Sequence, residues 1–294
     1  MLVWAIASQK GGVGKTTTVA SLSGWLQKEN LKVLLVDTDP HASITSYLGF
    51  ADDTLEHNLY DPYPEPQLTR ESVLNAVTHT RFPGIDIIAS TMTLATIDRQ
   101  LSGRIGVGRI LSRALELVAD SYDVALIDCP PVLGALMVNA LVASTMILVP
   151  TQTEFLALKG LEGMVRTFHI MHNADPNKEI SYIIVPTMYD RRTKASVHSL
   201  DHLRSHYHNS LWSNVIPVDT LFRESSQRGL PIPLMDASCR GAQAYRELLL
   251  HLLTREMERH AALVTPATAA VLTVDDGGGA AGTDGAAAGN EIGR

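Results

Sequence analysis

The chain has 294 residues, of which 45% are hydrophobic and 19% charged, so it has enough apolar material for one large α/β domain or two small ones. Its formal net charge of −7 argues against a protein that works mainly by coating nucleic acid, because such proteins are usually basic overall. The N-terminus lacks a basic leader and no apolar run approaches the roughly 20 residues of a spanning helix, so we expect a cytoplasmic protein without a membrane anchor.

Apolar runs of strand length alternate with longer helical patterns along most of the chain. We predict strands at residues 2–8, 32–37, 85–89, 123–128, 145–149, 180–186 and 212–216. We predict helices at residues 14–29, 106–119, 158–172, 194–207 and 241–260. Strands that are apolar on both faces and separated by helices indicate an α/β fold, a doubly wound, mostly parallel sheet with helices on both faces. Right-handed crossovers then bring the carboxyl ends of the strands, and any ligand, to one edge.

Two segments depart from this alternation. Residues 49–82 are rich in Pro, Asp and Tyr and are predicted to form a surface excursion. Towards the end of the chain the composition collapses to Ala, Gly, Thr and Asp, which cannot bury enough apolar surface to become ordered. We therefore predict a single domain over residues 1–260 and a disordered tail over residues 261–294.

A glycine-rich segment, KGGVGKTTT, follows the first predicted strand and opens the first predicted helix. In this context a match to a phosphate-binding P-loop is informative. Backbone N–H groups and the helix N-terminus would converge on the phosphates of a nucleotide such as ATP. The residues expected to surround the phosphates are Gly11, Gly12, Val13, Gly14, Lys15, Thr16 and Thr17. Lys15 is expected to reach the β- and γ-phosphates, Thr16 to bind Mg²⁺ and Thr17 to contact the α-phosphate.

Aspartates end two of the predicted apolar strands. The stretch VLLVDTDPHAS supplies Asp37 and Asp39, and VALIDCPPVLG supplies Asp128. We interpret Asp128 as the Walker B carboxylate, which holds Mg²⁺ through water or through Thr16. A lone aspartate at a strand end is often a helix cap, but three of them beside a P-loop indicate a magnesium–nucleotide site.

The early lysine of the loop, Lys10, has no obvious task in a single P-loop. The string K-G-G-x-G-K-S/T resembles the deviant Walker A motif of the ParA/MinD superfamily. The resemblance implies that Lys10 acts catalytically across a dimer interface on the other subunit's ATP, much as an arginine finger does. It further implies that Asp39 positions or deprotonates the attacking water and that Asp37 supports the metal shell. Nucleotide state would then control dimerisation, and ATPase activity is expected to be weak and stimulated by a partner.

The resemblance covers nearly the whole chain apart from the tail. After Asp128, CPPVLGALMVNAL resembles the switch II segment of the superfamily, and VPTQTEFLALKGLEGM and PTMYDRRTKAS resemble stretches of ParA and Soj proteins. The segment NVIPVDTLFRESSQRGLPI resembles one that lies near the adenine, which implies adenine contacts for Thr187, Met188 and Pro217. It departs from the common pattern at Val218 and Asp219, where Arg and Asn are usual.

ParA and Soj proteins bind DNA non-specifically as ATP dimers through surface arginines and lysines. The residues that would take this role are Arg191, Arg192, Lys194 and Arg204. A solvated charge cluster explains these four side chains equally well.

The stretch DTDPHASITSYLGF resembles the ParC-like ParA homologues of chemotaxis gene clusters, which help place chemoreceptor arrays at a cell pole. Most chromosomal Soj proteins instead read D-P-Q-G-N. His41 is not needed for hydrolysis, so we interpret it as a family marker rather than as a site residue.

The sequence predicts a ParA-type ATPase, an ATP-dependent dimerisation switch that positions chemotaxis arrays or chromosome or plasmid partition complexes. The expected partners are a second copy of the chain, a ParB-like protein or chemotaxis-cluster adaptor, and non-specific DNA, at a pole or on the nucleoid. One alternative is a metabolic enzyme of the dethiobiotin synthetase or amidoligase type, although no polar constellation for a second substrate is visible. Another is a MinD-like regulator of division or flagellar placement, although the chain does not end in a basic amphipathic helix. The carboxylates disfavour a non-catalytic DNA-binding scaffold.

Overall fold

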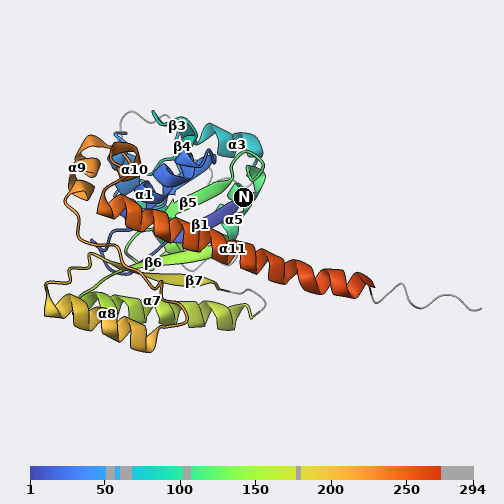
Figure 1. Ribbon diagram of the computed structural model, residues 1–294. Helices are drawn as coiled ribbons and strands as arrows, with labels where there is room; N and C mark the ends of the chain where they lie inside the picture. Colours follow the sequence, from blue (N-terminus) through green and yellow to red (C-terminus); the bar gives the residue numbers. More distant parts are fainter. Residues whose placement is uncertain (51–56, 60–67, 102–106, 177–179, 273–294) are drawn as a thin grey trace, which may run out of the picture. The chain divides into compact units, whose positions relative to one another are not determined.

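The computed structural model describes residues 1–50, 57–59, 68–101, 107–176 and 180–272 (Figure 1). The chain divides into two compact units, Met1–Leu249 and Leu250–Arg294. The first unit contains the sheet, the helices that cover it and the beginning of helix α11 (Arg240–Leu272).

The first unit is built on a seven-stranded sheet with the order β3-β4-β2-β5-β1-β6-β7. Its strands are β1 (Leu2–Ile6), β2 (Val33–Asp37), β3 (Val77–His79), β4 (Ile85–Ile88), β5 (Val124–Asp128), β6 (Met146–Gln152) and β7 (Tyr182–Thr187). All neighbouring pairs are parallel except β3 and β4. Every residue of β2 and β5 is buried, as a strand covered on both faces requires. The predicted mostly parallel, doubly wound sheet is confirmed.

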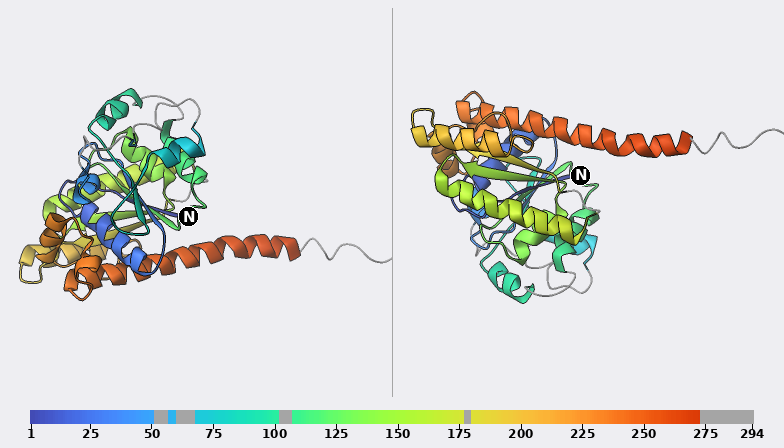
Figure 2. Two further views of the ribbon diagram at one scale, coloured as in Figure 1. Left: turned by 90° about the horizontal axis from the view of Figure 1, so that it is seen from above. Right: turned by 90° about the horizontal axis from the view of Figure 1, so that it is seen from below.

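The helices cover both faces of this sheet. They are α1 (Lys15–Lys28), α2 (Ser43–Tyr47), α3 (Arg70–Asn75), α4 (Leu94–Leu101), α5 (Ile110–Leu117), α6 (Ala135–Ala143), α7 (Phe155–Ala174), α8 (Lys194–His206), α9 (Leu221–Arg228) and α10 (Ile232–Met235). The crossovers after β1 and β5 run in opposite directions along the sheet, so right-handed connections place α1 and α6 on opposite faces. Figure 2 shows α1, in blue, on one side of the sheet and α5 and α6, in green, on the other.

The predicted strand at residues 212–216 is wrong. None of its residues lies in a strand, and the isolated bridges belong to the flanking residues, Leu211 with Ile184 and Pro217 with Tyr189. The N–H of Trp212 donates to the carbonyl of Ile184 at 3.0 Å, and the N–H of Ile216 donates to that of Pro186 at 2.8 Å. Between these two contacts the backbone bends at residues 213–214, which interrupts the ladder. An apolar run therefore lies along the sheet edge without becoming a strand.

The described part of the predicted surface excursion, residues 49–82, is more regular than expected. It contains α3 and β3, and the side chains of Leu59 and Val73 are buried in the core. Strand β3 pairs antiparallel with β4 at the sheet edge. Three residues are too few for a period-2 pattern to reveal a strand in the sequence. Residues 51–56 and 60–67 of the predicted excursion lie outside the described residues.

Helix α11 continues to Leu272, beyond the predicted end near His260. Residues 261–272 of the predicted tail are thus helical, which accords with their high alanine content. Residues 273–294 lie outside the described residues, and the proposed end of the domain near residue 260 stays a prediction. Across the part of the chain that the structure describes, none of the helices combines the length and the apolar character needed to traverse a bilayer.

Candidate functional site: a P-loop at the carboxyl edge of the sheet

The glycine-rich segment forms the turn between β1 and α1. Gly12 and Gly14 have φ angles of 73° and 96°, a left-handed conformation that disfavours any residue with a Cβ. Gly14 is the N-cap of α1 and therefore offers no side-chain acceptor to the first N–H groups of that helix. These N–H groups are available to an anionic ligand, which is the arrangement found at phosphate-binding helix N-termini.

Cross-strand pairing brings the predicted acidic residues together beside the P-loop. In the parallel register, Asp128 at the end of β5 is the partner of Ile6 on β1 and of Asp37 on β2. The hydroxyl of Thr16, in the first turn of α1, donates to Oδ2 of Asp128 at 2.7 Å. The other oxygen of Asp128, Oδ1, is buried and has no hydrogen-bond partner among the described residues.

Burial raises the pKa of both strand-end carboxyl groups. The pKa of Asp128 lies well above its usual range because the group is buried and because Asp37 adds negative charge nearby. Burial likewise raises the pKa of Asp37 to about 7, although hydrogen bonds from Thr45 oppose this shift. Two adjacent buried carboxylates with one unpartnered oxygen are destabilising unless a cation is present. Carboxylate and hydroxyl oxygens are the ligands that Mg²⁺ prefers, so Thr16 and Asp128 fit this ion.

Asp37 is held from two directions. Its Oδ2 accepts hydrogen bonds from the N–H of Thr45 at 3.0 Å and from the Thr45 hydroxyl at 2.7 Å. Its Oδ1 accepts the N–H of Asp39 at 3.1 Å. Asp37 therefore fixes the chain between β2 and α2 in the absence of any ligand, and its predicted support of a metal shell stays a prediction.

Asp39 lies in the turn that follows β2, and its side chain is only 9% exposed. Its Oδ1 accepts both the N–H of His41 and the Nδ1–H of the same residue, each at 3.0 Å. The turn is closed by the N–H of Ala42, which donates to the carbonyl of Asp39 at 2.8 Å. Asp39 thus lies beside Asp37 and Asp128, and its role near the attacking water stays a prediction.

Lys10 lies at the margin of the P-loop and points to its own chain. Its Nζ forms an ion pair with Glu154, the N-cap residue of α7. The side chains of the pair are 26% and 40% exposed. Lys10 packs beside Gly160 of α7, where a Cβ would lie 3.4 Å from the Lys10 Cβ. The predicted action of Lys10 across a dimer remains a prediction, and the sequence offered no signal for the pairing with Glu154.

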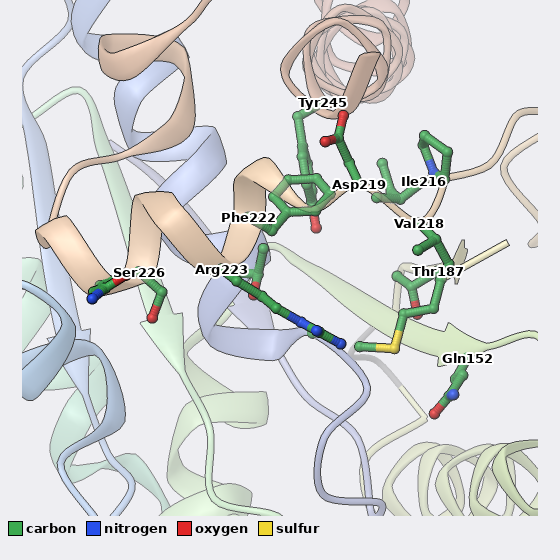
Figure 3. A pocket seen from close by; sticks show the side chains of 14 residues that line it. Gln152, Thr187, Ile216, Val218, Asp219, Phe222, Arg223, Ser226 and Tyr245 are labelled. Carbon is green, nitrogen blue, oxygen red and sulfur yellow. The ribbon is translucent and has the colours of Figure 1, made fainter. Parts of the chain in front are cut away.

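A cavity of about 600 Å³ opens beside the P-loop (Figure 3). Its lining includes all three predicted adenine contacts, Thr187, Met188 and Pro217, together with Gly14 and Thr17 of the loop. Sequence reasoning missed the remaining lining residues, Gln152, Ile216, Val218, Asp219, Phe222, Arg223, Ser226, Gln227 and Tyr245. Most belong to the segment NVIPVDTLFRESSQRGLPI, so the resemblance of that segment was the signal that could have found them.

The lining combines apolar surface with a few polar groups. The rings of Phe222 and Tyr245 pack edge to face with centroids 5.7 Å apart. Figure 3 shows the side chain of Arg223 extending from α9 towards Thr187. Asp219 is engaged structurally, because its two oxygens accept the N–H groups of Leu221 and Gly241, each at 3.0 Å. An aspartate in place of the usual asparagine thus joins the starts of α9 and α11.

The four predicted DNA contacts lie on the loop after β7 and on α8, and all are exposed. Arg192 forms a bidentate ion pair with Asp190, with its closest approach at 2.7 Å. Arg204 lies 3.8 Å from Asp201 on the same helix. Only two of the four, Arg191 and Lys194, lack an ion pair among the described residues. DNA contact by this group stays a prediction.

The site is that of a P-loop nucleotide-binding protein. It combines a glycine-rich loop after the first strand with an uncapped helix N-terminus, paired carboxyl groups at strand ends and an adjoining cavity. Residues 1–182 match the AAA_31 family, described as an AAA domain. The chain is 36% identical over 262 residues to the chromosome partitioning protein ParA of Caulobacter vibrioides, covering 88% of this chain and 96% of the relative. It is 35% identical over 244 residues to the sporulation initiation inhibitor protein Soj of Bacillus subtilis, covering 83% and 95%. The chain belongs to the ParA/MinD superfamily of P-loop ATPases.

Solved structures agree with this assignment of the fold. A crystal structure of cobyrinic acid a,c-diamide synthase from Mycobacterium smegmatis with bound ADP and magnesium is 32% identical, with a TM-score of 0.72 over 86% of this chain and 94% of that chain. An ATP complex of Cyanothece McdA has a TM-score of 0.76 over 86% of this chain and 96% of that chain. At 19% identity the second similarity shows the fold alone. The cobyrinic acid a,c-diamide synthase structure is named for a metabolic enzyme, whereas the relatives ParA and Soj are not.

Proposed function

We propose that this chain is a ParA-type ATPase in which ATP and Mg²⁺ control dimerisation, and that the cycle between monomer and dimer positions a cargo in the cell. The observation that carries the proposal is the position of Lys10. This early lysine of the P-loop is not part of the cavity lining, its side chain is 26% exposed, and its ion pair with Glu154 is itself only partly buried.

The residues of the site divide the work on ATP between them. The cavity takes the base and ribose, while the P-loop N–H groups and Lys15 hold the triphosphate. Bound Mg²⁺, held by Thr16 and Asp128, would neutralise charge on the β- and γ-phosphates. Asp39 orients the attacking water and accepts its proton, for which Oδ2 is available. Lys10 of a second subunit adds the positive charge that the transferred phosphoryl group requires.

The surface around the P-loop supports docking of a second copy. In the sheet order β1 lies between β5 and β6, so the loops after these two strands flank the P-loop. These flanking segments expose the large apolar side chains of Val132, Leu133, Phe155 and Leu156. Apolar side chains gathered at a functional edge are typical of a surface that a protein partner covers.

Light scattering with and without Mg-ATP tests the proposal. Wild-type protein is expected to dimerise only with ATP, and Lys15→Ala to lose nucleotide binding and therefore dimerisation. Asp39→Ala should accumulate as an ATP-bound dimer, whereas Lys10→Ala should bind ATP but dimerise weakly. Lys159→Ala is the matched control, because Lys159 also lies beside α7 residues that face the loop but forms its ion pair with Glu162, at 2.9 Å, rather than with Glu154. An Asp39→Ala protein that stays monomeric in ATP refutes the proposal, and rapid ATP turnover on a small carboxylate by a monomer would favour the metabolic alternative.

The proposed cargo is a chromosome or plasmid partition complex or a chemotaxis array, with a ParB-like protein or an adaptor that stimulates an intrinsically weak ATPase. The names of two chromosome-partitioning relatives, ParA of Caulobacter vibrioides and Soj of Treponema pallidum, support the first cargo, and the DPHASITSY stretch supports the second. A fluorescent fusion in the native cell separates them, because a nucleoid haze indicates partition and a polar focus indicates arrays. Steady-state phosphate release with and without the partner measures the stimulation.

Non-specific DNA binding belongs to the same proposal and involves Arg191 and Lys194. Replacing both by Ala should lower the affinity of the ATP-bound protein for random duplex DNA and reduce its salt dependence. Arg192→Ala serves as the control, because Asp190 already neutralises this side chain. Equal losses in the two variants would argue against the assignment.

A further inference from the structure

The stretch DPHASITSY, which follows β2, contains polar side chains that the proposed function leaves without a role. In the structure two of these side chains bond to aspartates of the site and a third bonds to the segment that follows α9. His41 bonds to Asp39, and Thr45 bonds to Asp37. The hydroxyl of Tyr47 donates to the carbonyl of Leu230, in the segment that follows α9. The stretch is therefore tied to the site by hydrogen bonds, and His41 is more than the family marker that the sequence predicted.

His41 is the member of this stretch that touches the proposed water-orienting residue. Its backbone N–H and its ring Nδ1 both lie 3.0 Å from the same oxygen, Oδ1 of Asp39. Because Oδ1 already accepts the backbone N–H, it acts as a hydrogen-bond acceptor, and the ring bonds to it with a hydrogen on Nδ1. No other side chain among the described residues bonds to this carboxylate, so Oδ2 is left available.

Asp39 needs such a restraint for two reasons. The terminal torsion of an aspartate has a broad, roughly two-fold preference, so a single hydrogen bond from the backbone leaves its oxygens poorly fixed. Asp39 also lies close enough to the carboxyl groups of Asp37 and Asp128 for its like charge to raise the pKa of both, so the three groups repel one another. A second donor on Oδ1 opposes this repulsion and fixes the plane of the carboxylate.

We propose that His41 is a positioning residue for ATP hydrolysis, whose Nδ1–H holds Oδ1 of Asp39 so that Oδ2 is presented to the attacking water. The inference rests on the proposed function, which assigns this water to Asp39. The imidazole is 76% exposed and does not touch the cavity, so it acts only through Asp39. Small errors in the placement of a reacting group lower the rate of reaction more than they lower substrate binding.

Steady-state phosphate release by the full-length chain tests the inference. His41→Phe keeps a ring of similar shape but removes the donor, and it should lower kcat about three- to tenfold with an unchanged KM for ATP. The loss is partial because the backbone N–H of residue 41 remains. His41→Asn places an amide N–H close to the position of Nδ1 and should restore most of kcat. A merely structural role in the turn would lower thermal stability in both variants and would not separate them in kcat.

Two further variants decide between the possible outcomes. His79→Phe is the matched control, because His79 is another exposed histidine whose Nδ1 bonds to an aspartate, Asp86, at 2.8 Å. It lies on β3, outside the nucleotide site, and should leave kcat unchanged. Asp39→Ala should abolish turnover. If it does so while His41→Phe turns over at the wild-type rate, or His41→Asn is as slow as His41→Phe, the positioning role is overturned and the proposed function stands. If Asp39→Ala keeps its turnover, the function proposed for Asp39 fails, and the role of His41 fails with it.

Discussion

The ion pair between Lys10 and Glu154 should make the dissociation constant of the proposed dimer depend on Glu154, a residue that need not touch ATP. In the proposed dimer Lys10 of each subunit contacts the ATP of the other subunit, so its ion pair with Glu154 must break. Forming one dimer therefore breaks two ion pairs. A partly exposed pair of this kind contributes about 0.5–1 kcal/mol. Removing both pairs from the monomers should therefore favour the dimer by about 1–2 kcal/mol, which corresponds to about five- to thirtyfold tighter dimerisation.

Glu154→Gln removes the charge while keeping the length of the side chain, and the dimer dissociation constant in Mg-ATP can be measured by sedimentation. Glu162→Gln is the control, since it deletes an acidic charge on the same helix from a pair with Lys159. The gain from Glu154→Gln should shrink as salt rises, because salt screens partly exposed pairs. Weaker dimerisation of Glu154→Gln, with Glu162→Gln unchanged, would show that Glu154 supports the dimer and would refute the release of Lys10 from a competing partner.

Three further variants test the framework of the site. Ala42→Gly should stabilise the protein by about 0.5–1 kcal/mol in thermal unfolding, because residue 42 has a φ of 52°, and an unchanged melting temperature would contradict this. Asp128→Asn should raise the melting temperature of the nucleotide-free protein by about 2–4 °C while abolishing the effect of Mg²⁺ on ATP binding. Burial raises the pKa of Asp37 to about 7, so its contribution to stability is complete below the unfolded pKa and is lost as pH rises through 7. Without Mg²⁺ the melting temperature should thus fall as the pH rises from about 4 to about 7 and level off above that, and Asp128→Asn should flatten this fall. Gly24→Ala should cost about 1–3 kcal/mol in denaturant unfolding despite its better helix propensity, because its Cβ would lie 2.8 Å from the Cβ of Pro231.

The strands of the central sheet other than β3, and the phosphate loop, could be predicted because their signals are local. An apolar run that ends in Asp37 or Asp128 reveals both a buried strand and the edge at which it stops. The glycines of the P-loop reveal a turn because Gly12 and Gly14 adopt positive φ angles. These features depend on neighbours within a few residues, which a pattern in one sequence records.

The missed features depend on contacts between distant parts of the chain. Glu154 follows β6, far along the sequence from Lys10, and their pairing appears only when β1 and β6 are side by side. The predicted strand at residues 212–216 failed for the converse reason. Its apolar residues do contact β7, but their spacing along the chain does not reveal that the backbone bends away between two hydrogen bonds.

The charges of the site explain why a nucleotide would be required before two subunits associate. Asp37, Asp39 and Asp128 lie close together, and Lys15 is the cation of the P-loop buried among them, while Lys10 is paired elsewhere. Bringing two such acidic edges together without ATP would add repulsion between like charges, with no gain for either Lys10. Bound ATP with Mg²⁺ changes both the repulsion and the energy of Lys10. The cation compensates the negative charge of the buried carboxylates, and the γ-phosphate offers Lys10 a stronger acceptor than Glu154. If the proposed function holds, the excess of carboxylate charge that destabilises the nucleotide-free site also makes dimerisation depend on ATP.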